Sequence, residues 1–240
     1  MRRFFTAKDG YLLVDADYSQ IELRVLAHIS GDEIMKKAFL EGVDIHTVTA
    51  SQVFNQPIEW VTPDLRSKAK AVNFGIVYGI GAFSLSKDIG VSVPKASEYI
   101  RSYLSKYSGI AHYMEQTVAK AKRDGYVETM FGRRRYIKEL AAKNKNLQAF
   151  GERVAKNTPI QGTAADIIKI AMIKVYNRLE KSGLDARLIL QVHDELIVEA
   201  KEDCAEKVAL LLKEEMENAV KLTVPMTVDV NIGKTWYDTH

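Results

Sequence analysis

The chain has 240 residues, of which 47% are hydrophobic and 27% charged, a balance typical of a folded globular protein rather than a disordered one. No run of about 18 apolar residues occurs, and residues 1–10 lack the apolar core of a signal peptide, so the sequence predicts no membrane partner. A net charge of +3 is too small to establish a nucleic-acid partner, and the single cysteine, Cys204, excludes an internal disulfide and favours an intracellular setting.

Apolar spacing and turn residues predict strands near both ends of the chain and helices between them. In chain order, we expect a strand at residues 4–18, helices at 19–29, over most of 31–54, at 62–78, 94–107 and 110–123, a hairpin at 125–136, helices at 148–156 and 162–181, two strands within 188–199, a helix at 205–220 and a strand at 224–232. Pro159 is expected to end the helix at 148–156. This order predicts an α+β fold, in which an antiparallel sheet with helices packed on one face is interrupted by a mostly helical insertion.

The stretch from Leu12 to Arg24, LLVDADYSQIELR, passes from a strand pattern to a helical one. Asp15 and Asp17 are two residues apart, so their carboxylates point to the same face of the strand. A carboxylate at the end of a buried strand is poorly solvated and needs a cation or a donor. The alternative is an ordinary strand end with solvated acids.

The helix at 62–78 carries Arg66, Lys70, Phe74 and Tyr78 at four-residue steps, which places them in one stripe. Two cations followed by two aromatic rings suit a nucleoside triphosphate, with the cations on the phosphates and a ring on the sugar or base. The alternative is an aromatic pair in the core beside a basic pair in solvent.

A set of basic and amide residues follows, and arginines in a turn are good phosphate ligands. Asn157 and Gln161 flank Pro159, so the sequence does not place them on one helix. The alternative is a solvated, charged surface. The set comprises Arg133, Arg134, Arg135, Lys143, Lys145, Arg153, Asn157 and Gln161.

Near the C-terminus, His193, Asp194 and Glu195 lie between two strands, where a tight turn would favour Asn-Gly or Gly-Gly. Such a local inconsistency is expected at functional sites, although an exposed acidic turn is the alternative. If Asp194 approaches Asp17, divalent metal relieves their repulsion, and carboxylates suit Mg²⁺. Two ions about 3.5–4 Å apart catalyse phosphoryl and nucleotidyl transfer.

These motifs resemble the polymerase domain of the family A DNA polymerases, the bacterial DNA polymerase I type. Five segments occur in the order of that family and span almost the whole chain: DYSQIELR at 17–24, RSKAKAVNFGIVYG at 66–79, TxxGRRR at 129–135, ERVAKNTPIQGTAAD at 152–166 and QVHDE at 191–195. The resemblance implies template-directed DNA synthesis, in which a dNTP is joined to a primer 3′-OH by a two-metal mechanism.

The resemblance also assigns roles to individual residues. Asp17, Asp194 and the backbone carbonyl of Tyr18 would hold two Mg²⁺ ions, which Mn²⁺ could replace, with support from Glu195. Lys70 would contact the phosphates and protonate the leaving pyrophosphate. Glu22 would block a ribose 2′-hydroxyl. The remaining dNTP-binding residues would be Gln20, His46, Arg66, Phe74 and Tyr78. The residues that touch the primer–template DNA would be Arg133, Arg134, Arg135, Arg153, Asn157, Gln161 and His193.

The implied fold is a palm at residues 1–30 and 149–240 with fingers inserted at 31–148. The chain begins just ahead of the first motif, so the family's thumb and exonuclease-type domains are expected to be absent, and the partner could be a separate thumb-bearing polypeptide or a second copy of the chain. Asp15 departs from the family's pattern, and we interpret it as a neighbour that adds negative potential rather than as a metal ligand.

Several alternatives remain open at this point. The chain could be a fragment that binds nucleotide or primer–template without efficient turnover, because every motif is present but the thumb is not. A single-subunit RNA polymerase has a similar palm, although Glu22 argues against it. A nuclease is disfavoured, because no segment is left for that domain. A polymerase of this type implies a cytoplasmic, nucleoid-associated location.

Overall fold

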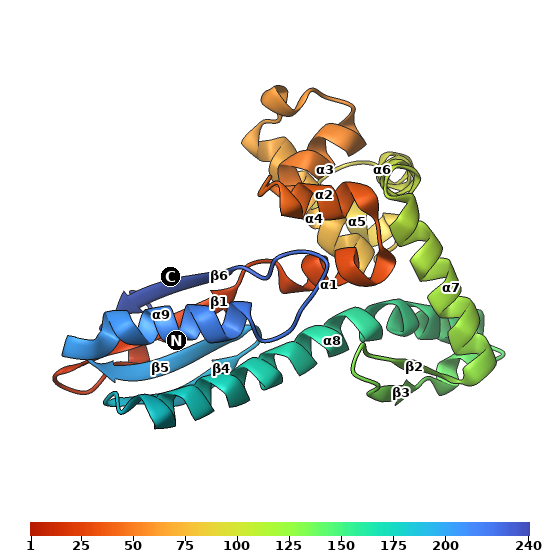
Figure 1. The fold of residues 1–240 in the computed structure, drawn as a ribbon. Coiled ribbons are helices and arrows are strands. Elements are labelled where there is room, and N and C mark those ends of the chain that lie inside the picture. Colours follow the sequence, from red (N-terminus) through yellow and green to blue (C-terminus); the bar gives the residue numbers. More distant parts are fainter. The chain divides into compact units, whose positions relative to one another are not determined.

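The computed structural model describes residues 1–240, apart from the side chain of Val77, and the chain forms two compact units (Figure 1). The first unit comprises residues 1–21 and 164–240, and the second comprises residues 22–163. The sequence places the joins near residues 30 and 148. Within the described residues, no helix is long and apolar enough to cross a membrane.

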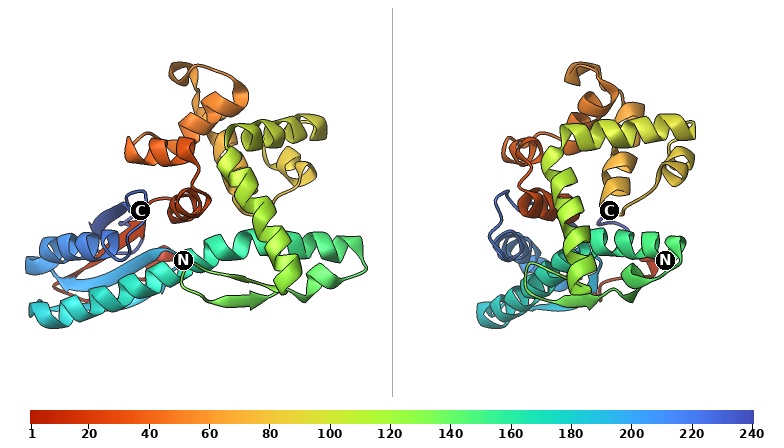
Figure 2. Two further views of the ribbon diagram at one scale, coloured as in Figure 1. Left: turned by 45° about the vertical axis from the view of Figure 1, so that its right-hand side comes forward. Right: turned by 90° about the vertical axis from the view of Figure 1, so that its right-hand side faces the viewer.

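The first unit is built on an antiparallel sheet in the order β4-β5-β1-β6 (Figures 1 and 2). Helix α9 packs against β1, β5 and β6, and the C-terminal part of α8 runs beside it, since Arg178 pairs with Glu214 and Glu215. The elements are η1 (Arg2–Phe4), β1 (Tyr11–Tyr18), the end of α8 (Lys145–Ser182), β4 (Ala186–Val192), β5 (Glu195–Lys201), η4 (Glu202–Cys204), α9 (Ala205–Glu217) and β6 (Val228–Gly233).

The two faces of this sheet differ in chemistry because side chains alternate along each strand. On β1, Val14, Ala16 and Tyr18 are buried, and the Tyr18 hydroxyl donates to the carbonyl of Met216 on α9 (2.6 Å). The intervening side chains, among them Asp15 and Asp17, therefore belong to the opposite face. The apolar face holds the sheet to its helices, and the opposite face carries the acids together with a buried apolar cluster of Ala7, Leu13, Ile197 and Trp236.

The second unit is mostly helical, and several of its helices begin at the capping residues that the sequence shows. The side chains of Asp32, Asp44, Thr62 and Ser92 each accept a hydrogen bond from a backbone N–H in the first turn. The elements are α1 (Ile21–Ser30), α2 (Glu33–Leu40), α3 (Ile45–Phe54), η2 (Ile58–Trp60), α4 (Pro63–Val77), α5 (Ala82–Asp88), α6 (Val93–Lys106), α7 (Ser108–Asp124), β2 (Tyr126–Glu128), β3 (Arg134–Tyr136), η3 (Lys138–Ala141) and the start of α8.

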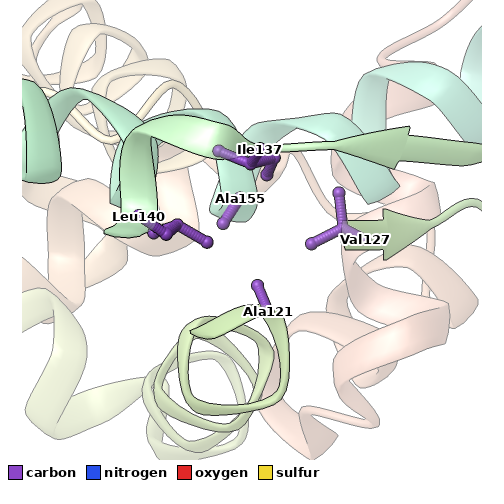
Figure 3. Close-up of a cluster of buried hydrophobic side chains, with 5 residues drawn as sticks. All are labelled: Ala121, Val127, Ile137, Leu140 and Ala155. Carbon is purple, nitrogen blue, oxygen red and sulfur yellow. The ribbon is translucent and has the colours of Figure 1, made fainter. Parts of the chain in front are cut away.

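A buried apolar cluster holds the β2–β3 hairpin to the neighbouring helices (Figure 3). Ala121 comes from α7, Val127 from β2, Ile137 and Leu140 from the segment after β3, and Ala155 from α8. Each of these side chains is buried. Because the hairpin is short, this packing rather than its own pairing fixes its position.

Two predictions about element bounds were wrong. Pro159 does not end a helix: α8 runs through it from Lys145 to Ser182, because Ala155 and Ile160 beside it are fully buried and their packing offsets the hydrogen bond that proline removes. The first strand begins at Tyr11 and not at residue 4, because a turn closes ahead of it through the N–H of Tyr11 and the carbonyl of Lys8 (3.1 Å). Helix α5 was not predicted. The α+β class is confirmed.

Candidate active site

The first group of site residues lies on the acidic face of the sheet. Asp17 on β1 is directly opposite Glu195 on β5, and Asp194 lies in the turn between β4 and β5. The N–H of Tyr18 donates to the carbonyl of Asp194 (3.3 Å), which holds that turn against the end of β1. The antiparallel register therefore brings Asp17, Asp194 and Glu195 together from distant parts of the sequence.

Burial and mutual repulsion disfavour the charged forms of these acids. Burial first, and then the charges of Asp194, Asp15 and Asp229, raise the pKa of Asp17 to about 6. Burial first, and then Asp15 and Asp17, raise the pKa of Glu195 to about 7. Burial also raises the pKa of Asp194. A cluster of this kind is stabilised by protons or by cations.

The donor set fits a divalent metal. Among the described residues, the buried oxygens Asp17 Oδ1 and Glu195 Oε1 have no hydrogen-bond partner. Carboxylate oxygens that repel one another and lack donors are suitable ligands for a hard divalent cation. The arrangement can therefore bind divalent metal at the junction of β1 and β5.

His240 belongs to this group, and sequence reasoning missed it. Its Nε2 lies 3.2 Å from Asp15 Oδ2 and 3.3 Å from Glu195 Oε2, and Thr239 Oγ1 donates to the same Asp15 oxygen (3.0 Å). The ligand atoms of Asp15, Glu195 and His240 lie within 4.8 Å of one another. No local pattern reveals this contact, because it joins opposite ends of the chain. Asp15 adds negative potential to Asp17, as its effect on that pKa shows.

Two non-glycine residues beside the acids have left-handed backbone conformations. Gln20 has a φ of 56° and follows the end of β1, and His193 has a φ of 50° and precedes Asp194. Such conformations are sparsely populated for L residues and concentrate at functional sites. Both residues were predicted site residues from the sequence.

In the second unit, the stripe on α4 begins with an arginine that is already paired. Arg66 donates from Nε to Asp44 Oδ2 (2.7 Å) and from Nη2 to Asp44 Oδ1 (3.1 Å), and Asp44 also caps α3 through the N–H of Thr47. Burial alone would raise the pKa of Asp44, but the hydrogen bonds from Arg66 and Thr47 outweigh it and lower the pKa to about 2. Asp44 was not predicted, since its only sequence signal is that of a helix cap.

His46 is buried beside the two aromatic rings of the stripe. His46 is 2% exposed and its ring lies 5.8 Å from that of Phe74, which stacks on Tyr78 at 6.1 Å. Burial lowers the pKa of His46 to about 4, so it is neutral at pH 7 rather than a cation. Lys70, one turn after Arg66, is exposed. A pocket of about 580 Å³ is lined by Phe74, Tyr78 and Arg153, among others.

Helix α8 brings together amide and basic residues that the sequence leaves apart. Because α8 is continuous through Pro159, Arg153, Asn157 and Gln161 follow one another at four-residue steps on one helix. Asn157 Nδ2 donates to the carbonyl of Tyr78 at the end of α4 (2.9 Å), and Arg153 packs on Gly79. This part of α8 therefore supports the end of the aromatic stripe.

Arg133 to Arg135 were expected in a turn, but Arg134 and Arg135 lie on β3, and the turn is at Met130 and Phe131 just ahead of them. Threonines hold this turn in place. The hydroxyl of Thr129 accepts from the N–H of Arg133 (3.2 Å), and Thr163 on α8 accepts from the N–H of Met130 (2.9 Å). Arg135 Nη1 donates to Thr158 Oγ1 on the same helix (3.2 Å). Arg133, Arg134 and Arg135 are all exposed.

Comparisons with known proteins give one consistent result. A model described as DNA polymerase family A matches residues 1–238. DNA polymerase I of Caldicellulosiruptor bescii is 51% identical over 239 residues, which cover 100% of this chain and 28% of the relative. Thermostable DNA polymerase I of Thermus aquaticus is 50% identical over 236 residues, covering 98% of this chain and 28% of the relative.

A solved structure agrees with these relatives. It is described as the POL domain of Pol1 from M. smegmatis in complex with DNA primer-template and dNTP, and it has a TM-score of 0.94 and 42% identity, covering 99% of this chain and 42% of that one. This chain spans little more than a quarter of the length of the two curated relatives. The resemblance predicted from the motifs is confirmed, and the chain belongs to DNA polymerase family A.

Proposed function

We propose that the chain catalyses template-directed DNA synthesis, transferring a nucleotide from a dNTP to the 3′-OH of a primer. The observation that carries the proposal is the cluster of Asp17, Asp194 and Glu195, whose charges repel one another and in which Asp17 and Glu195 each have a buried oxygen without a hydrogen-bond partner. Membership of DNA polymerase family A supports the same reaction, and so does the stripe of two cations and two aromatic rings along α4.

Two Mg²⁺ ions, or Mn²⁺ in their place, would supply the activation of the primer hydroxyl and the stabilisation of the leaving phosphates. Asp17 and Asp194 would hold them with the carbonyl of Tyr18. Glu195 would keep its carboxylate beside Asp17, the residue that it faces across the β1–β5 pair. His240 contacts both Glu195 and Asp15 beside this site.

The second unit would bind the nucleotide. Arg66 and Lys70 would neutralise phosphate charge, and Lys70 would protonate the pyrophosphate as it leaves. His46 would contribute a neutral hydrogen bond, because burial keeps its ring uncharged at pH 7. Phe74 and Tyr78 would pack on the sugar and base. Gln20 would lie close to the nucleotide, and Glu22 would exclude a ribose 2′-hydroxyl.

The primer–template would be bound mainly through its phosphates. Exposed arginines at the start of β3, after a turn held by threonines, suit phosphate binding, because their backbone is fixed while the guanidinium groups remain accessible. The residues proposed to touch DNA are Arg133, Arg134, Arg135, Arg153, Asn157, Gln161 and His193.

In family terms, we propose that the first unit is the palm and the second is the fingers. The join ahead of the fingers would lie between residues 21 and 30, and the join after them between residues 148 and 164. A cytoplasmic, nucleoid-associated location goes with this reaction. The relatives are longer than this chain, and a separate polypeptide that supplies their remaining segments stays a prediction.

The test is primer extension on duplexes that differ only in the templating base, with one dNTP offered at a time and Mg²⁺ present. The chain should add only the complementary nucleotide and should prefer dNTPs over rNTPs. Binding of dNTP and primer–template without any addition would favour a binding fragment. Addition that ignores the templating base would contradict the proposal.

A further inference from the structure

A chain of buried polar groups in the second unit ends at His46. Tyr107, Thr49 and Asn73 are each 0% exposed, and His46 is 2% exposed. His46 and Thr49 belong to α3, Asn73 to α4, and Tyr107 follows α6. Polar groups at this depth are stable only when their hydrogen bonds are satisfied. The Asn73 amide is oriented with Oδ1 toward Thr49 and Nδ2 toward His46, and this orientation fixes the donor and acceptor in each bond.

The assignment starts at Thr49. Its hydroxyl donates to Asn73 Oδ1 (3.1 Å), so the Thr49 oxygen is left to accept from the Tyr107 hydroxyl (3.0 Å). Since the amide oxygen of Asn73 accepts from Thr49, the amide nitrogen Nδ2 is the atom that lies 3.0 Å from His46 Nδ1. An amide nitrogen only donates, so Nδ1 carries no proton and the ring proton is on Nε2.

The surroundings of the ring agree with a single proton. Burial has the largest effect on the pKa of His46 and lowers it, Asp44 acts in the opposite direction, and the cations Arg66 and Lys70 lower it further, to about 4. At neutral pH the ring therefore carries no charge. Asp44 is itself committed to Arg66 and Thr47, which limits its effect on the imidazole.

We propose that Asn73 is a positioning residue for nucleotide binding, because it holds His46 in the Nε2-protonated tautomer and so presents one N–H, without positive charge, to a phosphate oxygen of the incoming dNTP. The phosphate partner rests on the function proposed above, whereas the tautomer depends on the buried network alone. Arg66 and Lys70 supply the charge at this surface, and His46 supplies a directed hydrogen bond. Directed donors add geometric selection that mobile lysine charges lack.

The tautomer can be observed directly in the full chain, which has five histidines. In ¹⁵N-histidine-labelled protein at pH 7, two-bond ¹H–¹⁵N spectra should show His46 with a protonated Nε2 and an unprotonated Nδ1. Asn73→Asp keeps the shape but replaces the donor with an acceptor, so the proton should appear on Nδ1 and the ring should become cationic. KM for dNTP should then rise about tenfold, with a smaller change in kcat.

A second variant keeps the test decisive if a buried aspartate impairs folding. Thr49→Val has nearly the same shape and removes the donor that orients Asn73, so His46 should show a mixture of tautomers. Thr117→Val is the matched control, because its hydroxyl donates to the carbonyl of Tyr113 outside the network, and its His46 signals should equal those of the wild type.

Either of two results would overturn the inference: a wild-type His46 with its proton on Nδ1 or with a charged ring at pH 7, or an Asn73→Asp protein with unchanged tautomer and unchanged KM. The expected spectrum together with no primer extension by the wild type would instead overturn the proposed function, and with it the phosphate role of His46. The two failures are therefore distinguishable.

Discussion

Asp17 on β1 and Glu195 on β5 should make the metal-free protein less stable as pH rises. Asp17 and Glu195 have pKa values raised to about 6 and about 7 in the folded protein, above ordinary values of 3.8 and 4.5. The folded state therefore binds more protons than the unfolded state over this window. The contribution of these two acids to the free energy of unfolding is fully present below their ordinary pKa values. It is lost as pH rises through the folded-state pKa values of about 6 and about 7.

The first prediction follows from that sign. Without divalent metal, the melting temperature should fall between pH 5 and about pH 7.5, and millimolar Mg²⁺ should restore it at the upper end, because the cation replaces the lost protons. Thermal melting across this range, with and without Mg²⁺, measures both effects. In Asp17→Asn the fall should be smaller. A melting temperature that rises with pH in the metal-free protein would contradict the assignment of these acids.

The second prediction concerns Asp44, which occupies Nε and one N–H of Nη2 on Arg66 and leaves the Nη1 edge for a phosphate. Asp44→Asn keeps a capping oxygen for α3 but loses the charged pair, so Arg66 should lose its fixed orientation. We expect KM for dNTP to rise about fivefold to thirtyfold with little change in melting temperature.

Asp32→Asn is the matched control, because Asp32 is also an N-cap and accepts from the N–H groups of Met35 and Gly109. Its KM should equal that of the wild type. A lower KM in Asp44→Asn would mean that Asp44 competes with the phosphates for Arg66 instead of positioning it.

The third prediction concerns sugar choice by Glu22, which lies in the first turn of α1 and is half-buried. Exclusion of a 2′-hydroxyl requires bulk, so Glu22→Ala should admit ribonucleotides. The ratio of kcat/KM for dNTP over rNTP should fall by at least about tenfold. An unchanged ratio would show that another side chain excludes the hydroxyl.

At the level of elements, the predictions succeeded where a signal is local. Thr62 and Pro63 are suited to the start of a helix and Gly79 to its end, and α4 begins and ends at these positions. Pro159 shows the limit of such signals. Its missing N–H predicts a helix end, but burial of the flanking side chains keeps α8 continuous.

The packing of α8 on the turn between Thr129 and β3 gives the fourth prediction. A Cβ added at Gly162 would meet Thr129 Cγ2 at 2.6 Å, so Gly162→Ala should displace the turn even though alanine favours helix. Melting temperature and primer–template affinity should both fall. Thr129→Ser removes the offending methyl group and keeps the hydroxyl, so the double variant should recover both. Equal losses in the single and double variants would exclude this overlap as the cause.

At the level of the whole molecule, no local pattern could show which distant residues meet. The contact of His240 with Asp15 and Glu195, and that of Asn157 with the end of α4, depend on strand order and helix packing. The family motifs compensate in part, because they associate Asp17 with Asp194 without a structure. They do not identify Asp44, Asn73 or His240.

The fifth prediction uses net charge. At +3, the chain has little general attraction for DNA, so binding should depend on a few local interactions with phosphates. Replacing Arg133, Arg134 and Arg135 together with glutamine should reduce the slope of log Kd against log salt by about 0.9 for each phosphate that the variant no longer neutralises. Arg101→Gln, an exposed arginine on α6, serves as control. An unchanged slope in the triple variant would place the DNA elsewhere.

Asp17 on β1 and Asp194 in the β4–β5 turn are proposed to hold the metal ions for nucleotide addition. Single-turnover addition of one complementary dNTP with Mg²⁺ tests this role most directly. Asp194→Ala should reduce the rate constant by at least about a thousandfold without lowering the melting temperature, because it removes a repelling charge. Asp203→Asn, at an exposed acid of the same unit, should leave the rate unchanged. Near-normal addition by the Asp194→Ala protein would contradict the account.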